Sequence, residues 1–393
     1  MQNLDQEILI NILALDKGFE EFEFIHSYLG PEQVQKLAAD IPVKRAYLNL
    51  KELKNHVDEK FPDEFPYFRR TYVHDCIDSI LAQTELFVFK KEPQFFKSFV
   101  ERLLGMQTFP QFDLYQELEC ANQTIKKQGF KSIQDYQNGR QEIRFQHDHQ
   151  LKACVRQIMK EQTAKVLKHA APLFDFPIED LLKKSKLCIE SSKPVDPPCY
   201  YYYQGQFHGT VGLKMMKKYH KDYLTNFLAH EVLPGHHFYY LIKEHYLKSK
   251  KTDLLMSIDT FYSPENLINE GLAVNSDLLL EGNTDPYVVS MLCLEKLLHK
   301  IYHNAWYQVN VEKNPINPEI EKIVSHEIGL KDASMRIEYF TQEAKYYTPS
   351  YSHGIHYVED IIKKQGKRVI SYLYGQQSVN TLRKLGAHYD RLS

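Results

Sequence analysis

Residues 228–240 read LAHEVLPGHHFYY, and the interpretation of the whole chain depends on this stretch. A histidine followed by a glutamate, His230 and Glu231, comes after an apolar approach. Two further histidines, His236 and His237, follow a Pro-Gly pair. Such side chains either bind a metal ion with a modified spacing or belong to a kinked helix whose histidines bind nothing.

The spacing of the histidines favours a metal site on an interrupted helix. In the motif HExxH two histidines four residues apart lie on one helical face, but here the fourth residue after His230 is Pro234. On an unbroken helix His237 would return to that face about 10 Å further along, too far to share an ion. Proline cannot donate an N–H, and Gly235 can adopt unusual backbone angles, so a bulge would bring His236 to the second ligand position. The spacing alone leaves open whether His236 or His237 is the ligand.

A catalytic zinc site needs three protein ligands and an open position for water. Residues 263–280, SPENLINEGLAVNSDLLL, form a mainly apolar predicted helix, so we expect Glu270 to be the third ligand. We expect Asp277 to hold a ligand histidine by its other ring nitrogen. His299 and His303 form a competing pair four residues apart, but no glutamate follows His299.

The bulk composition limits the classes of function. The 393 residues suffice for one large domain or two ordinary ones, and 49 Lys and Arg against 51 Asp and Glu give no reason to expect a nucleic-acid partner. No run of about 18 apolar residues predicts a membrane span, and residues 1–22 do not resemble a signal peptide. Six scattered cysteines are typical of reduced core thiols in a cytoplasmic protein. The oligomeric state stays open.

The pattern along the chain predicts a mainly α fold. Residues 1–190 repeat apolar residues at helical spacing and read as a helical N-terminal lobe, with one long helix over 141–174. The run Cys199–Tyr203 and the glycines after it predict a small β-sheet near residues 199–213. Helical periodicity then resumes, so we expect residues 191–393 to form a zinc-binding catalytic lobe, in one compact body with the first.

The stretch HEVLPGHH resembles the HExxPGHH signature of a bacterial family catalogued as domain of unknown function 885, which is grouped with the gluzincin metallopeptidases. NEGLAVNSDLLL, residues 269–280, resembles the family's following segment, EGWALYAE. The resemblance covers about residues 197–357. It implies a helical, two-lobed fold with a deep cleft, like that of thimet oligopeptidase and the Taq-type carboxypeptidases. It also implies the zinc ligands His230, His236 or His237, and Glu270, with Glu231 as general base.

The chain departs from this family in three respects. Family members are usually longer, and Gly271-Leu272 replaces the usual Gly-Trp. Residues 348–360, TPSYSHGIHYVED, replace a segment like PGQALSYKIG. Related enzymes take a tyrosine or histidine from this region to stabilise the oxyanion. Among the candidates Tyr351, His353, His356 and Tyr357, we favour Tyr357 and His353, although a loop centred on Gly354 with surface aromatics explains the segment equally well.

The sequence therefore predicts a zinc-dependent metallopeptidase that hydrolyses peptide bonds of short oligopeptides through a zinc-bound water activated by Glu231. The strand near Tyr200–Gln206 is expected to lie along the cleft and to pair with the substrate backbone. The alternatives are a metal-dependent amidohydrolase of a small metabolite and a non-catalytic zinc-binding scaffold. The expected partner is a peptide substrate, with neither nucleic acid nor membrane. The physiological substrate and the choice between endopeptidase and exopeptidase stay open.

Overall fold

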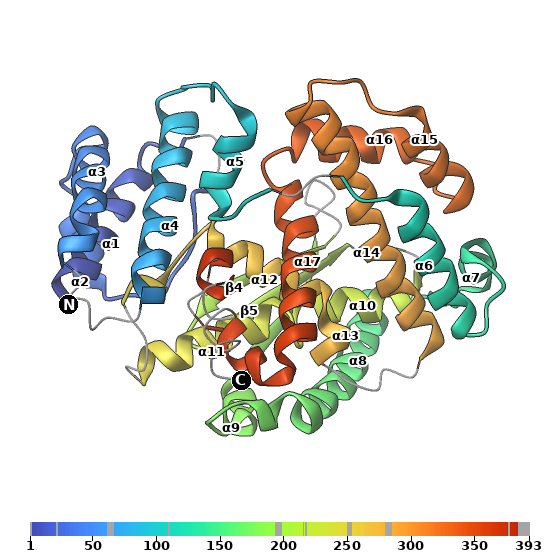
Figure 1. The fold of residues 1–393 in the computed structure, drawn as a ribbon. Helices are drawn as coiled ribbons and strands as arrows, with labels where there is room; N and C mark the ends of the chain where they lie inside the picture. The colour runs from blue at the N-terminus through green and yellow to red at the C-terminus, as the bar shows by residue number, and fades with distance from the viewer. Residues whose placement is uncertain are drawn as a thin grey trace. The chain divides into compact units, whose positions relative to one another are not determined.

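The structure is a computed structural model that describes residues 2–20, 23–60, 67–108, 111–192, 199–214, 216, 218–249, 254–279, 285–375 and 378–383. It is mainly helical, as the sequence predicts (Figure 1). The α-helices are α1 Gln2–Asp16, α2 Glu32–Ala38, α3 Val43–Lys60, α4 Tyr67–Gln83, α5 Phe96–Leu104, α6 Leu114–Lys127, α7 Ile133–Gly139, α8 Asp148–His169, α9 Ile178–Lys184, α10 Lys221–Glu231, α11 His236–Lys248, α12 Pro264–Val274, α13 Ser276–Leu279, α14 Pro286–Trp306, α15 Pro318–Lys322, α16 Ala333–Glu338, α17 Thr348–Gln365 and α18 Ile370–Leu373.

The strands form three small sheets. They are β1 Ile25–Tyr28, β2 Glu142–Arg144, β3 Lys186–Ser192, β4 Cys199–Gly205, β5 His208–Lys214, β6 Lys218–His220 and β7 Ile258–Thr260. β1 pairs with β7 and β2 with β6, both antiparallel, while β5 lies between a parallel β3 and an antiparallel β4. The predicted sheet and hairpin near residues 199–213 are therefore confirmed. The predicted long helix over 141–174 begins later, at Asp148, because residues 142–144 pair with β6.

Strand β4 alternates between a buried face and an exposed face, as a half-buried strand should. Tyr201 and Tyr203 are buried, and their rings pack against Tyr240 of α11. Tyr202, which points the other way, is 44% exposed. Within the described residues, β4 pairs along one edge only, through β5.

The chain folds into two compact units, each built from separate segments. The first unit contains residues 1–108, 241–269 and 360–393, and the second contains 109–240 and 270–359. The predicted division at residue 190 does not follow these units, because it assumed that each half of the chain folds as one piece.

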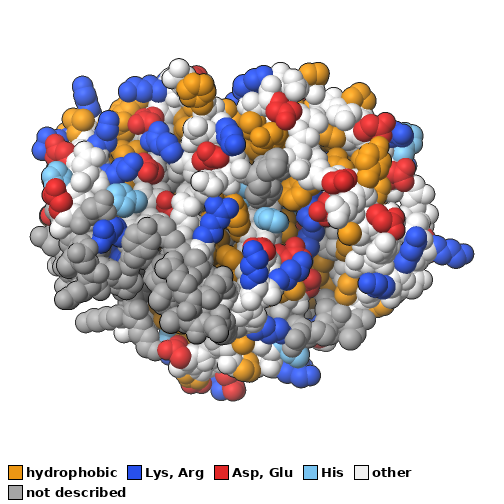
Figure 2. All heavy atoms as spheres, in the orientation of Figure 1, with side chains coloured by type: hydrophobic (Ala, Val, Ile, Leu, Met, Phe, Trp, Pro, Cys, Tyr) orange, Lys and Arg blue, Asp and Glu red, His pale blue; other side chains and the backbone are white. Residues whose placement is uncertain are grey.

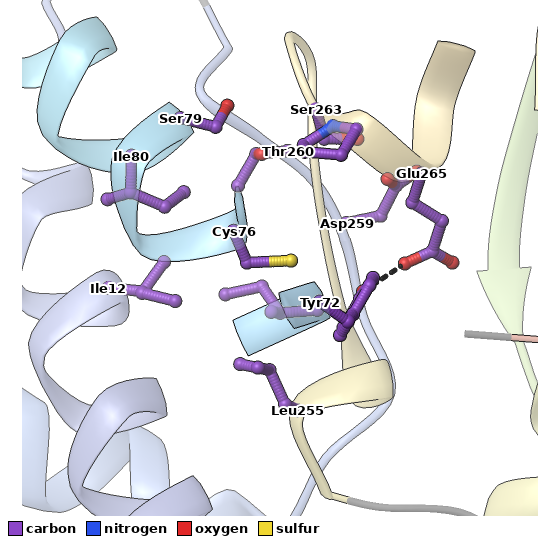
Figure 3. Close-up of a pocket in the computed structure, with 12 residues that line it drawn as sticks. Ile12, Tyr72, Cys76, Ser79, Ile80, Leu255, Asp259, Thr260, Ser263 and Glu265 are labelled. Carbon is purple, nitrogen blue, oxygen red and sulfur yellow. Dashed lines mark hydrogen bonds between the residues drawn. The ribbon is translucent and has the colours of Figure 1, made fainter. Parts of the chain in front are cut away.

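In the first unit α1, α3 and α4 lie side by side (Figure 1). Their apolar faces share a core with Leu255 and Ile258, which follow from much later in the chain. A cavity of about 30 Å³ between α1, α4 and residues 255–265 is shown in Figure 3. It has room for about one water molecule. Its lining includes Ile12, Tyr72, Cys76, Ser79, Leu255 and Glu265.

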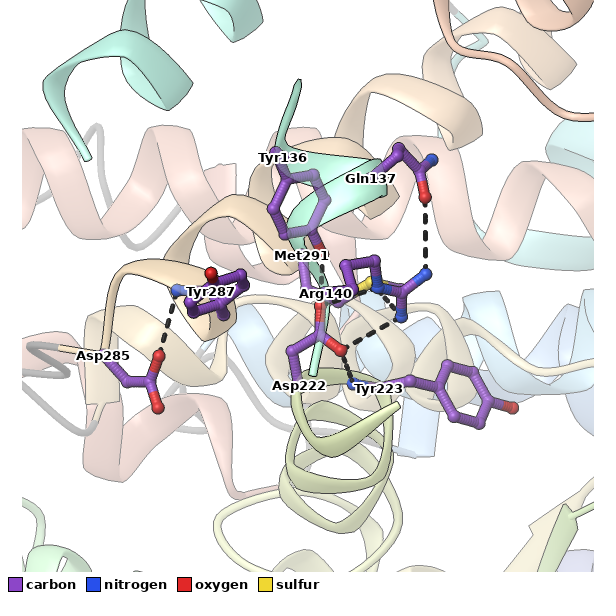
Figure 4. A network of polar contacts seen from close by, with 8 residues as sticks. All are labelled: Tyr136, Gln137, Arg140, Asp222, Tyr223, Asp285, Tyr287 and Met291. Atoms are coloured by element: carbon purple, nitrogen blue, oxygen red, sulfur yellow. Dashed lines mark hydrogen bonds and ion pairs between the residues drawn. The ribbon is translucent and has the colours of Figure 1, made fainter. Parts of the chain in front are cut away.

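The second unit is built around α14, which packs against α6 and α10. A polar network fixes the beginning of α10 (Figure 4). The buried carboxylate of Asp222 accepts hydrogen bonds from Tyr136 Oη at 2.5 Å and from Arg140 Nε at 2.8 Å. Because a buried carboxylate needs such partners, the network sets where α10 starts, two to three turns before His230.

The surface is chemically mixed. Acidic and basic side chains are interspersed on the face shown in Figure 2, in keeping with the nearly equal totals of the two charges. Among the described residues, no helix combines the length and the apolar character that crossing a bilayer requires. The described cysteines are free thiols, but Cys120 and Cys188 are exposed, so the expectation that the thiols lie in the core is wrong for these two.

Candidate metal centre

The stretch 228–240 is an interrupted helix. α10 ends at Glu231, four residues leave the helical path, and α11 begins at His236. The peptide bond between Leu233 and Pro234 is cis, and the Gly235 N–H donates to the carbonyl of Ala229 at 2.9 Å. The interruption predicted at the Pro-Gly pair is therefore present.

Gly235 allows the two helical segments to approach each other. A Cβ atom on Gly235 would lie 1.6 Å from the carbonyl oxygen of His230, so a larger residue cannot occupy this position without moving the backbone. As a result the rings of His230 and His236 lie 4.8 Å apart between centroids, with their planes at 89°. This arrangement replaces the four-residue spacing of HExxH.

His230, His236 and Glu270 lie together, with ligand atoms within 4.8 Å of one another. Glu270 Oε2 is 3.4 Å from His230 Nε2, and Glu270 Oε1 is 3.5 Å from His236 Nε2. Donors bound tetrahedrally to one zinc ion at about 2.0–2.1 Å lie roughly 3.3–3.4 Å apart, and each of these two separations, one from each Glu270 oxygen, is close to that value. Glu270 Oε2 is buried and has no hydrogen-bond partner within the described residues, which also fits a metal ligand.

Glu270 reaches this position because α12 lies close to α17. A Cβ atom on Gly271 would lie 2.3 Å from the carbonyl oxygen of Gly354, so the crossing of the two helices requires a glycine here. The next residue, Leu272, is buried. Gly271 is thus needed for the packing of the two helices. Leu272 occupies the position where the resembling family usually has a tryptophan, and it fills that position with a smaller apolar side chain.

His237 has a different role from His236. Its Nε2 lies 2.7 Å from Ser185 Oγ and its Nδ1 lies 2.7 Å from Tyr201 Oη. Burial lowers the pKa of His237 to about 3, so the ring is neutral and both nitrogens form hydrogen bonds. A Cβ atom on Gly209 would lie 2.7 Å from His237 Nδ1, so the strand must have a glycine there. The sequence left open whether His236 or His237 joins His230, and in the structure it is His236 that lies with His230 and Glu270. His237 lies outside this group, so its inclusion among the predicted ligands is corrected.

The carboxylates of this centre have different environments. Burial raises the pKa of Glu231, against the influence of His230 and His236, and within the described residues its carboxylate has no hydrogen bond or ion pair. Burial would raise the pKa of Glu270 too, but His236, His230 and Tyr347 hold it at about 2. Burial would lower the pKa of His230, but the nearby carboxylates of Glu270 and Glu231 raise it to about 9. The carboxyl of Glu270 is therefore held in its anionic form, whereas burial favours the protonated form of Glu231.

Two tyrosines adjoin this group, and the sequence analysis did not favour either. Tyr347 Oη donates to Glu270 Oε1 at 2.5 Å. The Tyr351 ring stacks on His299 at 4.6 Å and lies 6.4 Å from the ring of His230. Within the described residues the Tyr351 hydroxyl makes no hydrogen bond. Tyr347 immediately precedes α17 and Tyr351 lies in its first turn, and their four-residue spacing was the signal that could have identified them.

The preference for His353 and Tyr357 as oxyanion-stabilising residues stays a prediction, whereas the alternative of a loop centred on Gly354 is wrong. The segment is helical through Gly354, not a loop, so residue 353 lies about 200° around α17 from Tyr351. His353 Nδ1 is 3.2 Å from Ser352 Oγ, and its ring is 4.8 Å from that of His303. The Tyr357 ring lies 6.5 Å from His353 and 5.8 Å from His356.

The predicted role of Asp277 is also corrected. Asn275 separates α12 from α13, and its side chain donates to the carbonyl oxygens of Gly271 and Ile355. Asp277 therefore lies on a separate short helix, where its Oδ1 is 3.1 Å from Lys296 Nζ. It pairs with a lysine rather than with a ligand histidine.

His299 and His303 lie outside the group of three ligands. Burial lowers the pKa of His299 to about 4, which leaves a neutral ring stacked on Tyr351. His303 Nδ1 is 3.1 Å from Ser352 Oγ. One turn before His299, Glu295 accepts a hydrogen bond from Asn226 at 2.7 Å, and sequence reasoning did not single out this acid.

Comparisons with known proteins identify a protein of similar fold but do not assign the chain to a family. No protein-family model matches the chain, and no curated protein matches it. The solved structure of a putative lipoprotein from Colwellia psychrerythraea matches with a TM-score of 0.54 and 14% identity. The match covers 92% of this chain and 62% of that one, so this chain spans less than two thirds of that protein. At this identity the likeness shows a shared fold alone.

Proposed function

We propose that this protein is a zinc-dependent metallopeptidase that acts on short oligopeptides. The observation that carries the proposal is the gathering of His230, His236 and Glu270, next to Glu231, whose carboxylate has no hydrogen bond or ion pair within the described residues. Three ligands together with a free carboxylate are what metal-assisted hydrolysis requires. The resemblance of HEVLPGHH to the family of domain of unknown function 885 supports the same proposal, and we propose the gluzincin-type cleft that it implies together with the activity.

His230, His236 and Glu270 would hold the metal ion, which when bound polarises the scissile carbonyl and lowers the pKa of water. Glu231 accepts the proton of the attacking water and donates it to the leaving amine. Burial raises the pKa of Glu231, which makes its carboxylate a stronger base toward that water. Tyr351, whose hydroxyl makes no hydrogen bond within the described residues and whose ring lies 6.4 Å from that of His230, would stabilise the developing oxyanion.

Strand β4 supports a peptide as the substrate. Its Tyr201 contacts His237, the residue next to the ligand His236, so the strand lies beside the metal centre. Its unpaired edge, within the described residues, offers main-chain donors and acceptors. An extended peptide could add to this edge as a further strand, which would align its backbone with the three ligands.

The test is to load the purified protein with zinc and to measure cleavage of a mixed peptide library by mass spectrometry. We expect about one zinc per chain and cleavage that a chelator abolishes. A protein that binds zinc but leaves every peptide intact would contradict the peptidase proposal. Cleavage that persists after the metal has been removed would contradict the proposed mechanism.

A further inference from the structure

The two carboxylate oxygens of Glu270 have unequal surroundings. Oε1 accepts a hydrogen bond from Tyr347 Oη at 2.5 Å. Oε2 is buried without a hydrogen-bond partner in the described part of the chain, and it lies 3.4 Å from His230 Nε2. Oε1 also lies 3.5 Å from His236 Nε2, but it already accepts the Tyr347 hydrogen bond, whereas Oε2 accepts none and is available to a metal ion.

The hydroxyl donor of Tyr347 is held in place. Its backbone N–H donates to the carbonyl of Ala344 at 2.8 Å, and its own carbonyl accepts from the Ser350 N–H at 2.8 Å. Its ring packs at 75° against the ring of Tyr351, with 5.3 Å between centroids. The hydroxyl thus meets Glu270 from a fixed direction rather than as a mobile surface group.

A short hydrogen bond to a carboxylate oxygen reduces the ability of that oxygen to bind a cation. Hydrogen bonds from a hydroxyl to an anionic oxygen are among the strong ones, and about 2.5–2.7 Å is their usual length. Glu270 then has one good donor atom, Oε2. Together with the two histidines it gives three ligand atoms, which leaves a fourth position open in the tetrahedral geometry that zinc prefers. Ions that require six or more oxygen ligands gain from a carboxylate that binds through both oxygens.

We propose that Tyr347 is a positioning residue that makes Glu270 a one-oxygen ligand and so sets the preference of the site for a four-coordinate ion such as zinc. The inference rests on the metal-binding part of the proposed function and not on peptide hydrolysis. It concerns which metal the site selects and how the metal is held.

The test compares Tyr347→Phe with Tyr372→Phe, which removes a hydroxyl from an exposed ring in the other unit. Dissociation constants for zinc and manganese are measured by competition with a chelator, and the visible spectrum of the cobalt-loaded protein reports the coordination number. We expect Tyr347→Phe to weaken zinc about 10- to 100-fold, the usual effect of losing a group that orients a ligand. Manganese should weaken less, and the intense absorption of four-coordinate cobalt should decrease. Tyr372→Phe should match the unchanged protein.

An unchanged zinc constant and an unchanged cobalt spectrum in Tyr347→Phe would overturn the inference. Circular dichroism and thermal unfolding verify that the variant folds, which is expected because phenylalanine retains the ring. If the unchanged protein binds zinc but cleaves no peptide, the peptidase proposal fails and the metal constants still decide the role of Tyr347. If it binds neither zinc nor cobalt, Glu270 is not a ligand and both proposals fail.

Discussion

Glu231 is the residue at which the proposed chemistry can be separated from metal binding. It follows His230 directly, but its carboxylate has no partner within the described residues. Glu231→Gln should lower kcat by about 10²- to 10⁴-fold, the range that general acid–base catalysis supplies, and should leave zinc in place.

The measurement for Glu231 is peptide turnover together with zinc content by elemental analysis. Glu179→Gln serves as the control, because Glu179 is an exposed acid in an ordinary helical ion pair. Full turnover in Glu231→Gln would show that another group takes the proton.

The two adjacent histidines should respond differently to the same substitution. His236→Gln should lose zinc, because Nε2 of His236 lies among the ligand atoms. His237→Gln should retain zinc but unfold at a lower temperature, because His237 is buried and its loss disturbs the hydrogen bonds of Ser185 and Tyr201. A buried polar group left without a partner costs about 1–3 kcal/mol. Zinc stoichiometry and thermal unfolding of both variants are the measurements, and zinc loss in His237→Gln alone would reverse the assignment.

At the scale of single residues, the sequence identified ligand types more readily than positions. The motif predicted roles for His230, Glu231 and Glu270, and the structure places His230 and Glu270 in a group that could hold a metal ion. The choice between His236 and His237 depended on the path of the backbone between α10 and α11, which the amino-acid sequence alone does not specify. Tyr347 was missed because it contacts Glu270 across a separation of 77 residues, and local patterns contain no information about such a contact.

At the scale of elements, the interruption between α10 and α11 gives a prediction about Gly235. Gly235→Ala places a methyl group against the His230 carbonyl, with a separation of 1.6 Å before any relaxation. We expect the break to be rebuilt and zinc affinity to fall at least tenfold. Gly139→Ala is the matched control, because the nearest atom to its added Cβ is an ordinary 3.5 Å away. Unchanged zinc binding in Gly235→Ala would show that the close approach is not required.

A buried ion pair joins α11 and α12 in the first unit. Lys243 Nζ lies 2.7 Å from Glu265 Oε1, and both side chains are at most 5% exposed. Tyr72 also donates to Glu265 (Figure 3). Glu265→Gln removes the hydrogen-bonded one of two carboxylates that act on the buried Lys243 ammonium, the other being Asp259, and breaking such a pair should cost about 3–5 kcal/mol.

The measurement is the urea concentration at the midpoint of unfolding, determined for Glu265→Gln and for the control variant Glu179→Gln. The control breaks a pair whose side chains are 63% and 65% exposed, and such pairs contribute about 0–1 kcal/mol. Equal midpoints for the two variants would show that the buried pair does not stabilise the fold.

Strands were predicted correctly where the strand propensity and the turn residues occur within one short segment of the sequence. The run Cys199–Tyr203 has strand propensity and a turn after it, and β4 and β5 are present. β1 and β2 were read as helical, because each is short and is stabilised by a partner elsewhere in the chain. Ile25 pairs with Thr260, and Ile143 with Tyr219, at separations that a local pattern cannot show.

At the scale of the whole molecule, the path of the chain was not predictable from composition. The composition of the sequence changes near residue 190, but the chain passes from one compact unit to the other at about residues 108, 240, 269 and 359. Pro- and Gly-rich stretches mark loops and strands, not the limits of a unit. Contacts such as Asp75 with Ser378 place the end of the described chain in the first unit, and such pairings appear only in the folded structure.

The last prediction concerns the size of the substrate. An extended backbone must reach the edge of β4 and the three ligands together, and a short peptide is already unfolded. A folded protein would have to expose such a segment against a stability of about 5–15 kcal/mol, which lowers the fraction available by several orders of magnitude. We therefore expect chelator-sensitive cleavage of unstructured oligopeptides and little action on native proteins. The measurement offers one sequence both as a free peptide and within a stable folded domain. Preferential cleavage of the folded form would contradict recognition by strand addition.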